Sequence, residues 1–241
     1  MLQSNKRVTT EELSQHFQVS PCTIRNDLLK LEKEGLIRKI HGGAVFIENE
    51  GNIINFHSRE RKNSQEKTEI CQAALRHISN GQCIILDASS TALTLANLLE
   101  GFDRLTVITN GIYTMMALKD KPNITVIMTG GIVTKNSGSL EGLLGKDLFN
   151  EINIDIAFIS AQGFSLDAGL TDFNLYEASL KKLMIERAKT RIALLDYSKL
   201  EHVSIATFAS KDDLDTIITD KKASPEIVEK YRAAGLNVEI V

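Results

Sequence analysis

The chain has 241 residues, with 28 Lys and Arg against 31 Asp and Glu, which gives a net charge of −3 at pH 7. Hydrophobic residues make up 43% of the chain, enough for a buried core, yet no apolar run approaches the roughly 20 residues that span a bilayer. Cys22, Cys71 and Cys83 show no Cys-x-x-Cys pairing, which argues against a disulfide framework and a zinc site. No signal-peptide pattern follows Met1, so we expect a cytoplasmic protein with one small and one medium domain.

The positive charge is concentrated near the N-terminus. Residues 1–45 hold seven Lys or Arg and five Asp or Glu, a balance of +2, so residues 46–241 carry −5. This mild asymmetry permits nucleic-acid binding by the N-terminal segment but does not predict it alone.

A helix is predicted from residue 20 onward. Ser20 is a good N-cap, Pro21 suits the first helical position, and Ile24, Leu28 and Leu31 fall on one buried face. Residues 9–17 predict a shorter helix, capped by Thr9 or Thr10, with Leu13 and Phe17 facing inward. Two short helices joined by a tight polar turn form a helix-turn-helix, whose second helix enters the DNA major groove.

A β-hairpin is predicted directly after this helix. Gly35 ends the helix, and residues 36–46 place short β-prone runs on either side of Gly42-Gly43. Arg38, Lys39 and His41 on this wing suit contacts to the phosphate backbone.

Residues of both elements match a known signature. They are Val19-Ser20, Thr23-Ile24-Arg25, Asp27-Leu28, Leu31-Glu32, Gly35 and His41-Gly42-Gly43-Ala44. In these residues the chain resembles the DeoR family of bacterial regulators of sugar metabolism. The resemblance implies DNA contacts by Ser20, Cys22, Thr23, Arg25, Asn26, Lys30, Arg38, Lys39, His41 and Gly42. Family members usually carry Arg at the position of Asn26, and Asn pairs with adenine where Arg favours guanine, so the operator is expected to differ.

The resemblance also sets the expected domain limits. We expect a DNA-binding domain at residues 1–46, a linker at 47–65 and an effector-binding domain at 66–241. The family's first helix begins about a dozen residues before the position of Leu2, so Met1–Asn5 reads as the tail of that helix. We therefore expect the true start to lie upstream of Met1.

The second domain alternates apolar strands with helices. Strands are predicted at residues 83–86, 105–108, 124–128, 154–159, 191–195, 204–208 and 216–218, and a terminal pair of elements at 225–234 and 237–241 completes the set. Helices are predicted at residues 66–78, 92–99, 113–118 and 176–188. Continuous apolar strands between helices indicate an α/β fold with a Rossmann-like, mostly parallel sheet that is covered on both faces.

Small polar residues follow the carboxyl ends of these strands, where ligands bind in open α/β sheets. Five such loops suit a polyol phosphate, because glycine and hydroxyl side chains let backbone N–H groups approach an anion. Each loop taken singly is also explained by helix capping and turn formation. The predicted effector residues are Asp87, Ser89, Ser90, Thr91, Asn110, Gly130, Gly131, Gln162 and Lys199.

Within this set, Asp87 is expected to bind sugar hydroxyls, Ser89 to Thr91 the phosphate, and Lys199 to supply positive charge. Asp172, Glu177 and Lys181 either line the rim of the site or form a solvated helix face. The family resemblance extends to this domain and implies a fold similar to ribose-5-phosphate isomerase and coenzyme A transferases.

Two functions compete. A repressor of a carbohydrate catabolic operon, released by a phosphorylated sugar, uses both domains and needs at least a dimer on two half-sites. A sugar-phosphate isomerase would use Asp87 or Glu177 as the base with Lys199. However, isomerase activity does not require a winged helix-turn-helix domain. No Gly-x-Gly-x-x-Gly follows a strand and no Walker lysine loop occurs, so we expect no nucleotide cofactor. We also expect no metal and no catalytic residues.

Overall fold

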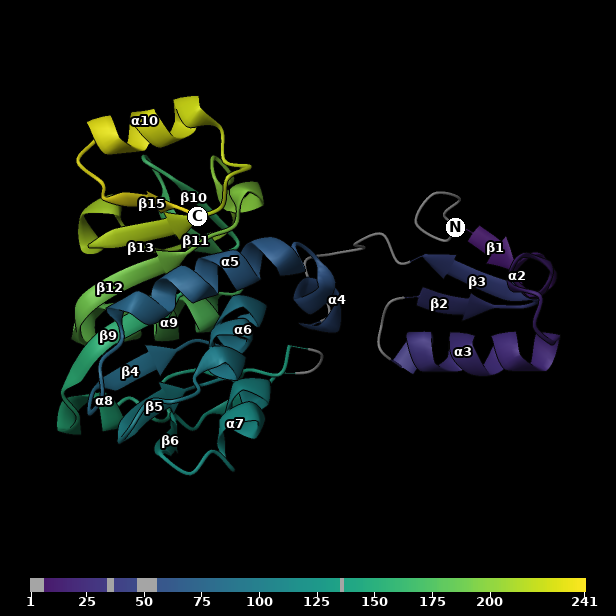
Figure 1. The fold of residues 1–241 in the computed structure, drawn as a ribbon, viewed down its shortest axis with the longest axis horizontal. Helices are drawn as coiled ribbons and strands as arrows, with labels where there is room; N and C mark the ends of the chain where they lie inside the picture. The colour runs from purple at the N-terminus through teal and green to yellow at the C-terminus, as the bar shows by residue number, and fades with distance from the viewer. Residues whose placement is uncertain (1–6, 34–36, 47–55, 135–136) are drawn as a thin grey trace. The chain divides into compact units, whose positions relative to one another are not determined.

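The computed structural model of the chain describes residues 7–33, 37–46, 56–134 and 137–241 (Figure 1). These residues form two compact units that divide between Lys62 and Asn63. The first unit contains β1 (Arg7–Thr9), α2 (Thr10–Phe17), α3 (Pro21–Lys33), β2 (Ile37–Ile40), β3 (Gly43–Phe46) and α4 (Phe56–Arg61).

The first unit is a helix-turn-helix with a wing, as predicted. β2 and β3 form the antiparallel hairpin, and β1, which the sequence did not predict, pairs with β3 to make a three-stranded sheet. Thr9 begins α2 with a capping box: its side chain accepts from the Glu12 N–H at 3.1 Å, and the Glu12 carboxylate accepts from the Thr9 N–H at 2.7 Å. The Ser20 hydroxyl accepts from the Thr23 N–H at 3.1 Å and so caps α3.

The core of this unit is small. Leu13 of α2 packs with Ile24 and Leu28 of α3, and the cluster also contains Val8, Ile37 and Ala44. The prediction for Phe17 was wrong, because its side chain is 59% exposed. The described core ends one helical turn before Phe17, where α2 stops at the left-handed Gln18, and the Phe17 ring instead packs edge-on against His16.

The predicted linker differs in part from the structure. Residues 47–55, the Met1–Asn5 segment and Gly35 lie outside the described residues. Residues 56–61 form α4, and α5 begins at Ser64, two residues before the predicted start.

The second unit contains the remaining elements. In chain order they are α5 (Ser64–Ala74), η1 (Leu75–His77), β4 (Cys83–Leu86), α6 (Ser90–Leu98), β5 (Leu105–Thr109), α7 (Ile112–Leu118), β6 (Ile124–Met128), β7 (Ile132–Val133), β8 (Leu140–Glu141), α8 (Leu148–Glu151), β9 (Ile154–Ile159), β10 (Gly163–Ser165), β11 (Gly169–Asp172), α9 (Leu175–Arg187), β12 (Ala188–Leu194), η2 (Tyr197–Lys199), β13 (Ala206–Ala209), η3 (Lys211–Asp213), β14 (Thr216–Thr219), α10 (Pro225–Ala233) and β15 (Val238–Ile240).

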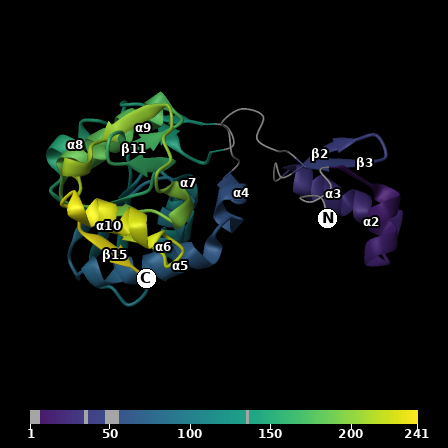
Figure 2. The same ribbon diagram turned by 90° about the horizontal axis from the view of Figure 1, so that it is seen from above.

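Its centre is a seven-stranded sheet in the order β15-β14-β12-β9-β4-β5-β6, and every pair is parallel. Successive strand residues alternate between two cores. Ile84 and Leu86 face the core under α5 and α6, whereas Ile85 faces the core under α8, α9 and α10. Figure 2 shows α9 on one side of the sheet and α5 and α6 on the other. The predicted α/β class with both faces covered is therefore confirmed, and it explains the apolar runs in the central strands, such as residues 84–86 of β4 and 156–159 of β9.

The chain order reverses between β4 and β9. From β4 the chain adds β5 and β6 on one side, and from β9 it adds β12, β14 and β15 on the other. Such a switch point opens a crevice at the carboxyl ends of the strands. β13, predicted as part of the main sheet, instead joins β10 and β11 in a small antiparallel sheet, and β7 and β8 form a separate hairpin.

Candidate DNA interface and effector site

The face of α3 opposite its buried stripe is exposed, as a recognition helix requires. Cys22, Thr23, Arg25, Asn26 and Lys30 are all exposed. Ser20 is also exposed, but its hydroxyl lies 2.9 Å from that of Thr23 besides capping the helix. The residues of α3 that were predicted to contact DNA therefore lie on one solvent-exposed surface.

The wing presents the turn predicted to contact phosphate. His41 and Gly42 are exposed, and Gly42 has a φ of +78°, which a glycine adopts at low cost. Gly43 is required for a different reason, because a Cβ there would lie 2.1 Å from the carbonyl oxygen of Val8. The Lys39 N–H donates to the Glu32 carboxylate at 2.8 Å and so ties β2 to α3. The Arg38 side chain lies outside the described atoms.

In the second unit, Asp87 lies at the switch point of the sheet. It follows β4 and is fully buried. One carboxylate oxygen accepts from the Ser89 N–H at 3.0 Å, and the other accepts from the Ser160 N–H after β9, also at 3.0 Å. Asp87 therefore joins the ends of the two strands between which a ligand crevice would open.

A buried lysine completes this arrangement. Lys181 of α9 lies 3.2 Å from Asp87 and 2.7 Å from Asp172, with Glu177 at 3.8 Å, and it donates to the Ser160 carbonyl at 2.9 Å. Burial by itself lowers the pKa of Lys181, but the three carboxylates outweigh burial and hold that pKa above its ordinary value. The ammonium group stays charged at neutral pH.

One of the two sequence-based interpretations of Asp172, Glu177 and Lys181 was wrong. These side chains do not form a solvated helix face, since all three residues are 3% exposed. The other interpretation, that they line the rim of the effector site, stays a prediction. Four-residue spacing on α9 brings Glu177 under Lys181, and the turn of β11 into α9 brings Asp172. Asp87, which lies far from these residues in the sequence, completes a cluster that no local pattern could reveal.

The predicted phosphate loop forms the start of α6. Ser89 is its N-cap and accepts from the Ala92 N–H at 3.0 Å. Ser90 and Thr91 occupy the first turn, where backbone N–H groups and the helix dipole favour an anion. All three side chains are buried.

Sequence analysis missed the lysine at this loop. Lys67 of α5 is 4% exposed, and its ammonium group donates to the Ser90 hydroxyl at 3.1 Å. The only available signal was the position of Lys67 in the first turn of an amphipathic helix, which does not distinguish it from a surface lysine.

The first turn of α5 contacts two further loops. Asn63, its N-cap residue, donates to the Asp196 carboxylate at 2.8 Å, and Asp196 also accepts from the Ser198 N–H at 3.0 Å. Glu66 forms an ion pair with Lys222, which follows β14. Predicted Lys199 lies half-buried in η2, the turn capped by Asp196.

The loops after β5 and β6 are covered by the β7–β8 hairpin. Asn110 is fully buried; its amide group donates to the Leu140 carbonyl at 3.0 Å, and its side-chain oxygen has no partner among the described residues. Gly131 is needed because a Cβ there would lie 2.5 Å from the Glu141 carbonyl oxygen. Glu141 is buried and accepts from the Ser139 hydroxyl and the Asn174 amide.

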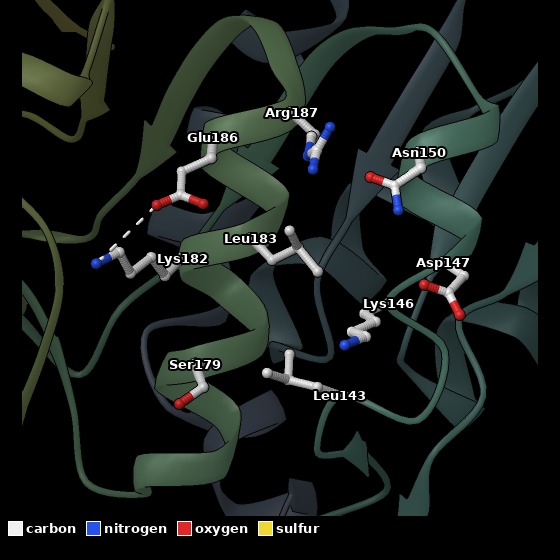
Figure 3. A pocket seen from close by; sticks show the side chains of 9 residues that line it. All are labelled: Leu143, Lys146, Asp147, Asn150, Ser179, Lys182, Leu183, Glu186 and Arg187. Atoms are coloured by element: carbon white, nitrogen blue, oxygen red, sulfur yellow. Dashed lines mark ion pairs between the residues drawn. The ribbon is translucent and has the colours of Figure 1, made fainter.

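The predicted effector residues thus fall into two groups. Asp87, Ser89, Ser90, Thr91 and Asn110 are buried together near the switch point. Gly130 is exposed, and Gly131, Gln162 and Lys199 are half-buried. A surface groove of about 500 Å³ between α9 and the segment 143–150 includes none of these residues (Figure 3).

Among the described residues, no group of His, Cys, Asp and Glu side chains is arranged to hold a metal ion. No described helix is long and apolar enough to cross a membrane.

Comparison with known proteins covers nearly the whole chain. Residues 1–50 match the DeoR-like helix-turn-helix domain, and residues 62–221 match the DeoR C-terminal sensor domain. The chain is 49% identical to the HTH-type transcriptional regulator GolR of Listeria innocua, over 100% of this chain and 94% of that protein. It is 29% identical to the glycerol-3-phosphate regulon repressor of Escherichia coli, over 97% of this chain and 92% of the repressor. Ribose 5-phosphate isomerase A of Methanocaldococcus jannaschii aligns with 58% of this chain and 55% of its own, at 20% identity and a TM-score of 0.43.

Proposed function

Because the chain belongs to the DeoR family of transcriptional regulators, we propose that it represses a carbohydrate catabolic operon and is released by a phosphorylated sugar. The first unit, called the head from here on, binds operator DNA in the cytoplasm through the exposed face of α3 and the wing. The second unit holds the effector at the carboxyl ends of its strands. Two heads on two half-sites require at least a dimer.

The observation that carries the effector site is the buried contact between Lys67 and Ser90. A lysine whose ammonium group lies 3.1 Å from the Ser90 hydroxyl, at the N-terminus of α6, adds a full positive charge to a site that already favours anions. We assign the phosphate to Ser89, Ser90, Thr91 and Lys67. Lys199 supplies further positive charge from η2.

The sugar end would meet hydrogen-bond acceptors. The Asn110 side-chain oxygen, which has no partner among the described residues, can accept from a sugar hydroxyl. Asp87 already has protein partners on both oxygens, so we assign it a positioning role between β4 and β9 in place of direct sugar contact.

Coupling to the head follows from the position of α5. The helix turn that carries Lys67 also carries Asn63 and Glu66, which contact the loops after β12 and β14. Along the chain, this turn is also the first part of the second unit that follows the head. An effector that changes these contacts biases α5 and, through the chain, the state of the head that binds DNA.

We also propose that the protein has no isomerase activity. Asp87 and Glu177, the candidate bases, lie in the buried cluster with Lys181, where hydrogen bonds and ion pairs already engage them. Ribose 5-phosphate should turn over at the buffer rate when the purified protein is present, and a faster rate would contradict a purely regulatory function.

Fluorescence anisotropy on DNA upstream of the protein's own operon tests the proposal. One compound in a panel of triose, pentose and hexose phosphates should weaken DNA binding about tenfold, a coupling of about 1.4 kcal/mol. Lys67→Met should abolish this response while DNA affinity stays at the wild-type value. Lys189→Met, which removes an exposed charge at the amino end of β12, is the matched control. A full effector response in Lys67→Met would refute the assigned phosphate site.

A further inference from the structure

The outer face of α9 does not look like a solvated surface. Leu175, Tyr176, Ser179 and Leu183 lie at helical spacing on one stripe, and Leu175 and Tyr176 are 66% and 69% exposed. A helix that covers one face of a sheet ordinarily turns polar residues to water. Leu175 and Tyr176 therefore stay exposed within the described chain, whereas Leu183 is half-buried and packs partly against the core.

A second segment continues the same apolar surface. Leu143 faces Ser179 and Leu183 across the groove of Figure 3, and the neighbouring Leu144 is 77% exposed. The contact of the Asn174 amide with Glu141, at 2.8 Å, fixes the start of α9 against the end of β8 and so holds these two segments together. We name Leu143, Leu144, Leu175, Tyr176 and Leu183 the α9 face.

Charges of both signs surround the α9 face. Lys146, Lys182 and Arg187 line the groove together with Asp147 and Glu186 (Figure 3). A nucleic acid or an anionic membrane would favour a rim of one sign. A rim that mixes both signs can pair with itself, since a two-fold axis that places an acidic residue of one copy opposite a basic residue of the other forms the same pair twice. An apolar centre with such a rim is the usual composition of a protein–protein interface.

We infer that the α9 face is an interface with a second copy of this chain. The occupant is a copy of the same chain because the rim is self-complementary and because a head that reads two half-sites needs a partner head. The second of these reasons, the need for a partner head, rests on the proposed function. The contact lies on the second unit, so it holds two chains together whether or not DNA is bound.

Sedimentation velocity on the full chain tests the interface. The wild-type protein should sediment at twice the 26.7 kDa chain mass or more, and Leu144→Glu/Tyr176→Glu should lower that mass by half or more. A buried carboxylate without a partner is costly, and these exposed positions should tolerate it in the separate chain. Ile205→Glu, at an apolar residue 67% exposed next to β13, is the matched control and should leave the mass unchanged. A monomeric wild type, or an unchanged mass in the double variant, would overturn the interface.

A conservative variant gives a second readout that does not depend on disruption. The chain contains no tryptophan, so Tyr176→Trp reports on this position alone. Its emission should lie at short wavelength in the assembly and shift to long wavelength on dilution to the monomer. Long-wavelength emission from an intact assembly would place Tyr176 in water and exclude it from the interface.

The two proposals fail in different measurements. If the wild-type protein binds no operator and responds to no sugar phosphate, yet the double variant loses its assembly, the proposed function fails and the interface stands. If operator and effector binding hold but the double variant keeps its mass, the interface lies elsewhere.

Discussion

At the scale of single residues, the second unit depends on a lysine buried among three carboxylates. Lys181 lies within ion-pair distance of Asp87, Asp172 and Glu177, and all four side chains are buried. Removing the lysine would leave three buried carboxylates without this cation. The penalty of such uncompensated charge exceeds the modest net value of the pairs themselves.

Lys181→Met should therefore destabilise the protein by about 3–5 kcal/mol. Lys189→Met, at a side chain 67% exposed at the amino end of β12, should change stability by less than about 0.5 kcal/mol. Urea unfolding at one fixed protein concentration measures both, since assembly makes stability depend on concentration. Equal midpoints for the two variants would show that the cluster contributes no more than a surface charge.

The three cysteines differ in environment and should differ in reactivity. Burial raises the pKa of the Cys71 thiol to about 12, and burial together with Asp155 raises that of Cys83 to about 11. The thiolate is the reactive form, so at pH 8 both groups are almost wholly protonated. Cys22 is exposed on α3. Iodoacetamide at pH 8 should modify Cys22 in the native protein and the other two only in denaturant. Mass spectrometry that finds Cys71 modified as fast as Cys22 would contradict the buried position.

At the scale of elements, the β7–β8 hairpin is held over the sheet by close backbone approach. A Cβ on Gly145 would lie 1.5 Å from the Thr129 carbonyl oxygen, directly after β6. Glycine is thus needed here for space. Gly142 is needed for its φ of +83° instead, because a Cβ added there would have no neighbouring atom within 4 Å among the described residues.

Gly145→Ala should consequently loosen the segment that joins β8 to α8. The backbone must move to relieve the clash, while Gly142→Ala should cost only the left-handed strain of about 1–2 kcal/mol. Hydrogen exchange should show faster exchange around residue 129 and residues 140–150 in Gly145→Ala than in Gly142→Ala. The same exchange rates in both variants would refute the packing role of Gly145.

At the scale of the whole molecule, recognition of DNA and of the effector falls to two compact units with separate cores. A change on the exposed face of α3 should therefore alter DNA binding without altering effector binding. The same separation means that the two activities can be measured independently on one protein.

Arg25→Ala should weaken operator binding by about 1–3 kcal/mol if the arginine reads a base, and effector affinity should not change. Arg76→Ala, at a side chain 66% exposed in the second unit, is the control of equal charge. Affinity for the operator should also fall as salt rises, because phosphate contacts release counterions. Unchanged operator affinity in Arg25→Ala would remove this residue from the interface.

Local pattern by itself determined much of this protein. Strands β4, β6 and β9 begin and end where the sequence predicts. For β4 and β9, which are largely buried, the reason is that a strand buried on both faces is a largely apolar run with polar limits. The cap Ser20 was also evident, since an N-cap acts over only three residues, whereas the choice of Thr9 over Thr10 came from the structure. The family signature lies in the same local spacing, so the class of protein was evident from the sequence as well.

Only the tertiary structure decided which polar side chains meet. Strand β1 is three residues long and exists because β3 offers it an edge, so no periodicity marked it. Lys67 meets Ser90 across 23 residues, and Lys181 meets Asp87 across a longer stretch of chain. Local sequence determines the periodicity and the limits of an element. The order of strands in the sheet determines which distant residues share a buried site, and that order depends on the packing of the whole unit.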